Sequence, residues 1–141
     1  MRLNREKIFK KFREIDEAMG KLERFKSVPK EEFIENTDYN YIAYAGFVIL
    51  TEAVIDICFH ISAKKLKKAP TEYAECFNFL KENNLLDPQT SDILSEMARF
   101  RNLLIHGYGK VDFGKVHNYI SDSLWAINVF KEKVKSLVEA E

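Results

Sequence analysis

The 141-residue sequence is poor in residues that break or cross-link a chain: it has five glycines, three prolines and two cysteines. So few glycines and prolines disfavour a disordered chain or a multi-stranded sandwich, and 46% hydrophobic residues are enough to form a core. Cys58 and Cys76 form no CxxC pair and are too few for a disulfide framework, so we expect reduced thiols in a cytosolic protein. This composition predicts an all-α protein with one domain over residues 1–141.

Net charge is also absent, because 22 lysines and arginines balance 22 aspartates and glutamates. No overall field therefore draws the protein to nucleic acid or to an anionic membrane, and a phosphate contact must come from a local patch. The charged N-terminus lacks the apolar core of a signal peptide. Glu52, Asp56 and His60 interrupt the most apolar run, 41–61, and would be costly in lipid. We expect a cytoplasmic protein without a membrane span.

Apolar residues recur at helical spacing in the first half of the chain. Pro29 and the glutamates after it predict a short helix or an ordered connector. A long helix is expected over residues 38–67, with Asp38 as its N-cap, and its nearly all-round apolar surface must be central or covered by a partner chain. The first apolar stripe consists of Ile8, Phe12, Ile15, Met19, Leu22 and Phe25.

Capping signals divide the second half of the chain. Pro70 ends the long helix, and Thr71 is expected to cap the next one. Asp87 and Pro88 predict an N-cap and a first-turn proline for a further helix, and a final helix is expected over residues 113–137. Four main helices with short connections, plus one shorter helix, predict an up-and-down bundle.

The most unusual stretch is RNLLIHGYGKVD, residues 101–112. Arg101 and His106 are separated by about 500° of helix, so their side chains point about 140° apart. If the helix ends near His106, Gly107 suits a left-handed position just beyond it. A helix C-terminus attracts positive charge by itself, so a purely structural explanation stays open for Arg101 and His106.

This stretch resembles the R-x4-H-x-Y motif of the HEPN superfamily, specifically that of the HepT-like toxins. Arg101, four residues NLLI, His106, Gly107 and Tyr108 match the motif, and Asn102 matches the frequent R-N start. The likeness extends over nearly the whole chain, including TEAVIDICFHI in the long helix. It implies a metal-independent endoribonuclease with no cofactor, the toxin of a toxin–antitoxin pair, built as a helical homodimer whose two motifs line a shared cleft.

The chemistry of these side chains supports the same roles. Cleaving RNA without a metal needs a proton acceptor for the 2′-hydroxyl, a proton donor for the leaving 5′-oxygen and a cation for the growing charge. His106 can exchange protons near neutral pH, and Arg101 can bind phosphate with a permanently charged planar fork. Because one histidine cannot easily serve both sides of an in-line displacement, a dimer that contributes two is expected. The product would be a 2′,3′-cyclic phosphate.

The resemblance also implies a protein partner. HepT-like toxins are silenced by a small nucleotidyltransferase of the MntA type, which transfers AMP to the motif tyrosine, so Tyr108 is the candidate acceptor. Tyr108 could instead pack at the end of the bundle. The alternative function is a non-catalytic HEPN module that presents nucleotide or substrate to a nucleotidyltransferase, and a third is a purely structural helical dimer.

Glu52, Asp56 and His60 form a polar stripe at four-residue spacing on the long helix. Glu52 or Asp56 could orient Arg101, or the stripe could be a polar seam within the bundle or a dimer interface. No second cluster completes a metal site. Two further groups could contact RNA. The first is the lysine cluster Lys64, Lys65, Lys67 and Lys68, which a solvated helix end explains better. The second is the aromatic run YNYIAY, which core or dimer packing explains better.

Overall fold

The computed structural model describes residues 1–107 and 109–141, and these residues form helices and no strand. A 3₁₀ turn (Arg24–Ser27) extends the first helix, and a π-helical turn (Ser62–Leu66) extends the third. The helices are α1 (Arg5–Glu23), α2 (Lys30–Glu35), α3 (Thr37–Ile61), α4 (Tyr73–Glu82), α5 (Pro88–His106), α6 (Phe113–Asp122) and α7 (Leu124–Glu139). The predicted all-α class is confirmed.

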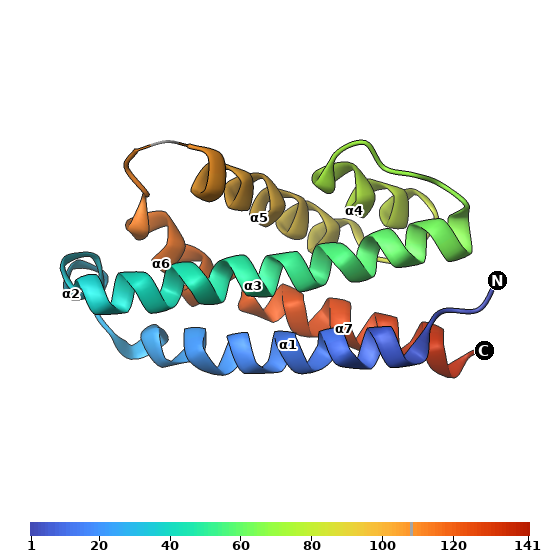
Figure 1. Cartoon of the computed structure of the whole chain (residues 1–141), viewed down its shortest axis with the longest axis horizontal. Helices are drawn as coiled ribbons and strands as arrows, with labels where there is room; N and C mark the ends of the chain where they lie inside the picture. The colour runs from blue at the N-terminus through green and yellow to red at the C-terminus, as the bar shows by residue number, and fades with distance from the viewer. Residues whose placement is uncertain (108) are drawn as a thin grey trace.

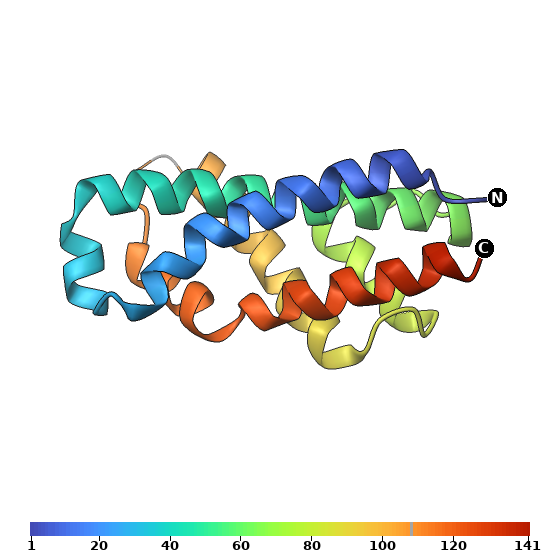
Figure 2. The same cartoon turned by 90° about the horizontal axis from the view of Figure 1, so that it is seen from below.

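The helices α1 and α3 lie side by side along the long axis of the molecule, and both chain termini lie at the same end (Figures 1 and 2). The α4–α5 pair packs against α3, while α7 contacts both α5 and α1. Figure 1 shows α4 and α5 together on one side of α3, with α1 on the other. The central helix α3 therefore connects α1 to the α5 helix that carries the motif.

Helical periodicity explains which side chains form the core. The whole apolar stripe predicted for residues 8–25 is buried. Deeper in the bundle, Phe47, Phe100 and Tyr119 join α3, α5 and α6, with ring centroids 5.2–5.7 Å apart. Burying Phe47 contributes roughly 2 kcal/mol, and each aromatic pair adds about 1 kcal/mol. This cluster fixes the position of α5 on α3.

The helix caps show which residues start each helix. Asn36, not Asp38, caps α3: its side-chain oxygen accepts from the amide of Tyr39 at 3.1 Å. Thr71 does not cap α4, because Glu72, with an extended backbone (φ −133°, ψ 152°), holds the N-cap position and forms no side-chain bond there. Asp87 caps α5 as predicted.

The predicted last helix, 113–137, is two helices. Ser123 leaves helical geometry (φ −126°, ψ −5°), which ends α6 and lets α7 begin in a new direction. The break allows α6 to pack against α2 while α7 contacts α5 and α1. Apolar spacing continues across Ser123, so periodicity alone did not reveal the bend.

The long helix α3 behaves as a core helix over much of its surface. The segment Thr37–Leu66 is long and apolar enough to cross a membrane, yet 56% of its most apolar window is buried inside the protein. Two large side chains remain open on it: Tyr41 is 77% exposed and Ile49 is 49% exposed. The prediction that α3 is central is confirmed by its packing against α1, α4 and α5.

Candidate active site

The helix α5 carries the motif to the surface. It begins with the Asp87 cap and ends at His106, where the sequence predicted. Its last turn is held from two directions: the Gly107 amide donates to the Leu103 carbonyl at 2.8 Å, and the Tyr44 hydroxyl of α3 donates to the Leu104 carbonyl at 3.2 Å. The tyrosine satisfies a carbonyl that the helix end leaves without an intrahelical partner.

Gly107 does not adopt the predicted left-handed conformation. Its backbone is right-handed (φ −75°, ψ 0°), and it closes the helix through the bond to Leu103. A Cβ atom at this position would collide with the carbonyl oxygen of Leu103. Glycine is therefore required by close backbone approach, not by a positive φ.

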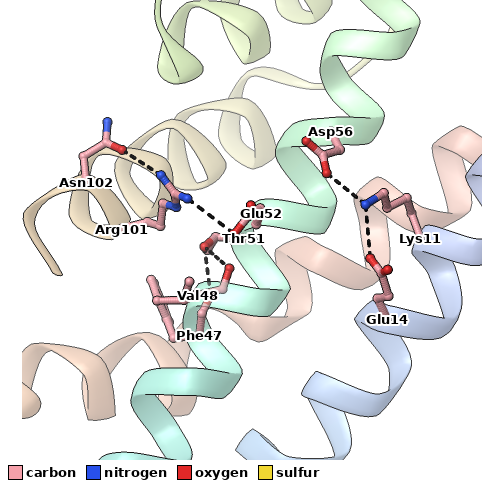
Figure 3. Close-up of polar contacts among 9 residues, drawn as sticks. All are labelled: Lys11, Glu14, Phe47, Val48, Thr51, Glu52, Asp56, Arg101 and Asn102. Carbon is pink, nitrogen blue, oxygen red and sulfur yellow. Dashed lines mark hydrogen bonds and ion pairs between the residues drawn. The ribbon is translucent and has the colours of Figure 1, made fainter. Parts of the chain in front are cut away.

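Arg101 is buried and has three neighbours, of which Figure 3 shows Glu52 and Asn102. Its Nη2 lies 3.4 Å from Glu52 Oε2 on α3, its Nη1 lies 3.3 Å from Asn102 Oδ1, and its guanidinium carbon lies 5.2 Å from the centre of the Tyr73 ring. Within the described residues, the buried Nε has no hydrogen-bond partner. A buried cation needs partners, and two long polar contacts and one aromatic ring supply them only in part.

His106 lies on the other side of α5, exposed to solvent. It lines an open cleft of about 840 Å³ between the start of α4 and the last turns of α5. Asn102 and Tyr73 line this cleft and also contact Arg101. The two motif side chains thus leave α5 in different directions, but shared neighbours connect them. The complete lining is Thr71, Glu72, Tyr73, Ala74, Arg99, Asn102, Leu103, His106 and Gly107.

The two carboxylates of the polar stripe have different partners. Glu52 contacts Arg101, whereas Asp56 pairs with Lys11 of α1 at 2.9 Å and does not contact Arg101 (Figure 3). The hydrogen bond with Asp56 raises the pKa of Lys11, although burial opposes it. Asp56 therefore joins α3 to α1, and Glu52 joins α3 to α5.

His60 makes a third, separate contact. Its Nε2 accepts the backbone amide of Asn4 at 2.9 Å, at the start of α1. Burial lowers the pKa of His60, and the nearby charges of Lys7 and Lys64 lower it further. A neutral imidazole that accepts a backbone hydrogen bond is a structural contact between α3 and α1.

The other sequence candidates lie away from the cleft. Lys65 pairs with Glu141, and Lys68 stacks on Phe79 with Nζ 4.8 Å from the ring centre. Among residues 1–107 and 109–141, no group of three or more histidine, cysteine, aspartate or glutamate side chains could hold a metal ion. Tyr108, the candidate AMP acceptor, lies outside the described residues.

Sequence reasoning missed two parts of this cleft. Arg99 is exposed and stands seven residues before His106, so both lie on one face of α5. That spacing was a usable signal. The opposite wall, residues 71–74, comes from the start of α4, and no local pattern indicated that this segment faces the motif.

The all-helical bundle has the fold of a HEPN-like domain. The fold is similar to that of a tri-AMPylated Shewanella oneidensis HEPN toxin solved in complex with an MNT antitoxin: the TM-score is 0.84 at 22% identity, over 95% of this chain and 99% of that one. It is also similar to YutE of Bacillus subtilis, a cytosolic protein of unknown function, with a TM-score of 0.84 at 17% identity over 98% and 92% of the two chains.

Sequence comparison identifies the family. The model of the ribonuclease HepT-like family matches residues 15–137, so the chain belongs to that family. A curated relative, the tRNA nuclease HepT of Aphanizomenon flos-aquae, is 25% identical over 123 residues, which cover 86% of this chain and 83% of that protein. The resemblance inferred from the motif is confirmed.

Proposed function

We propose that this protein is a metal-independent endoribonuclease, the toxin of a toxin–antitoxin pair. The observation that carries the proposal is the exposed His106 in an open cleft, linked through Asn102 and Tyr73 to the buried cation Arg101. Membership of the HepT-like family and the tRNA nuclease relative support an RNA substrate.

In the proposed reaction, neutral His106 accepts the proton of the 2′-hydroxyl, and the 2′-oxygen attacks phosphorus. The bond from phosphorus to the 5′-oxygen breaks, and this oxygen leaves with a proton from a protonated histidine. The products are a 2′,3′-cyclic phosphate and a 5′-hydroxyl. Arg101, held by Glu52 and Asn102, stabilises the charge on the non-bridging oxygens.

A homodimer would supply the second histidine. Leu103 of α5, which lines the cleft, is 63% exposed. A large apolar side chain left open beside the cleft favours a covering partner, and a two-fold dimer would bring two His106 side chains to one site. Light scattering of the native protein tests the dimer, and Leu103→Glu should yield a folded monomer without cleavage activity.

The proposed partner is an MntA-type nucleotidyltransferase that transfers AMP to Tyr108. The AMPylated, antitoxin-bound HEPN toxin of similar fold supports this assignment. An AMP group two residues from His106 would repel an RNA phosphate by charge and block it by bulk. Intact mass after incubation with the nucleotidyltransferase and ATP should show AMP addition to the native chain and none to Tyr108→Phe.

Cleavage of structured and unstructured RNA with chelator present tests the catalytic proposal. His106→Ala should lower kcat about 100-fold or more, because general acid–base catalysis contributes about that much. His60→Gln is the matched control, since His60 contacts Asn4 away from the cleft and should keep activity. Unchanged cleavage by His106→Ala would exclude the mechanism. No cleavage by the native protein, with tight binding to the nucleotidyltransferase, would support the non-catalytic HEPN module instead.

A further inference from the structure

Residues of α5 outside the motif also line the cleft. Arg99, Asn102, Leu103 and His106 follow one another at steps of three, one and three residues and all line the same cleft. Side chains at this spacing share a helix face. Arg99 and His106 are two helical turns apart, about 10 Å along the axis. The cleft thus presents two cationic or protonatable side chains at separate points.

The two arginines of α5 have opposite environments. Arg101 is 8% exposed and contacts Glu52, Asn102 and Tyr73. Arg99 is exposed, and within the described residues its guanidinium forms neither an ion pair nor a hydrogen bond. A guanidinium in water at the edge of a cleft keeps all its donors for a ligand, and its planar fork matches a phosphate.

The two walls of the cleft carry opposite charges, which would orient an anionic ligand. Glu72 of the opposite wall is exposed, so its carboxylate repels an anion from the α4 side. Arg99 attracts the anion to the α5 side, where His106 also lies. A polyanion in this cleft is therefore drawn along α5 and not along the start of α4.

We propose that Arg99 is a substrate-binding residue that holds a phosphate of the RNA strand next to the one cleaved at His106. The inference rests on the proposed ribonuclease function and extends it by naming the residue that aligns the strand. The separation of about two helical turns places Arg99 at a flanking phosphate, while Arg101 and His106 act at the scissile one. Arg99 therefore contributes to RNA affinity more than to the chemical step.

RNA binding at several salt concentrations tests this role. Binding is measured in the His106→Ala background so that the RNA stays intact, and cleavage kinetics in the native background. Arg99→Ala should weaken binding about tenfold and reduce the slope of log affinity against log salt by about 0.7, the loss of one phosphate contact to a single strand. In cleavage, KM should rise while kcat changes little.

Three variants serve as comparisons. Arg99→Lys should retain the salt slope, because it keeps the charge. Glu72→Gln should tighten binding, because it removes the repelling carboxylate. Arg13→Ala removes an exposed arginine of α1 that does not line the cleft, and it should bind RNA as the native protein does. Circular dichroism verifies that each variant is folded.

The outcomes separate this inference from the function on which it rests. If the native protein cleaves RNA but Arg99→Ala and Arg13→Ala bind it with equal affinity and equal salt slope, the role of Arg99 is wrong and the ribonuclease proposal stands. If Arg99→Ala lowers kcat without changing KM, Arg99 acts in the chemical step and not in binding the flanking phosphate. If the native protein does not cleave RNA at all, the proposed function fails first.

Discussion

Replacing Glu52 by glutamine separates the positioning of Arg101 from the stability of the bundle. The substitution keeps the shape of the side chain and removes the charge that faces Arg101. We expect a small loss of stability and a larger loss of activity, because the amide oxygen of glutamine can still accept from Arg101 but no longer holds it by charge.

The size of both effects follows from the geometry. Unit charges 3.4 Å apart attract by about 1 kcal/mol in bulk water. The Glu52 side chain is 55% exposed, so water screens the pair and its net contribution stays at about 0.5–1 kcal/mol. Activity is more sensitive, because a displaced catalytic cation loses alignment with the transition state, and we expect kcat to fall about tenfold with KM nearly unchanged.

Asp56→Asn is the matched control. It lies one helical turn further along α3 and breaks the 2.9 Å pair with Lys11, which is also partly exposed. Urea unfolding should show similar losses of stability for both variants, while RNA cleavage should fall only for Glu52→Gln. Equal activity in the two variants would refute the idea that Glu52 positions Arg101.

Two further predictions concern the folded state. The amide of Thr90 donates to the Asp87 cap and lowers the pKa of this carboxyl. The stabilisation by the cap is therefore complete above the unfolded pKa of about 4 and disappears as the pH falls through the lower folded value. Urea unfolding over a pH series should show Asp87→Ala about 1 kcal/mol less stable than the native protein at pH 7, with the difference shrinking in acid; a pH-independent difference would contradict this. Burial raises the pKa of the Cys58 thiol well above its usual range, and Cys76 is buried beside Ser62. Iodoacetamide at pH 8 should label both thiols only after unfolding, as mass spectrometry can check, and rapid labelling of the folded protein would show that the core opens.

The sequence predictions succeeded where the feature depends on contacts between residues close together in the sequence. The apolar stripe of residues 8–25, the Asp87 cap and the end of α5 at His106 were all predictable. Each depends on contacts between residues three or four positions apart, which the sequence displays directly. The arginine–histidine motif was equally visible, and with it the family.

Some local predictions failed for local reasons. Asn36 and Asp38 both have capping side chains, and only the extended backbone of Asn36 (φ −93°, ψ 105°) places its oxygen on the Tyr39 amide. Ser123 interrupts a continuous apolar pattern, because burying α6 and α7 against different neighbours favours a bend over one straight helix. Helical periodicity does not tell which of two neighbouring residues caps a helix, or whether one straight helix or two helices form, since the apolar residues are the same in either case.

The sequence by itself therefore determined the helical class, most of the helices with their apolar faces, and the presence of Arg101 and His106 at one helix end. Only the tertiary structure decided which groups surround them. Glu52 and Asp56 are equivalent in the pattern, but packing brings α5 to Glu52, 49 residues from Arg101, and α1 to Asp56. Tertiary packing likewise places the start of α4 opposite the motif, where it forms the other wall of the cleft. Such contacts depend on how buried faces fit together across the bundle, and helical spacing carries no information about that fit.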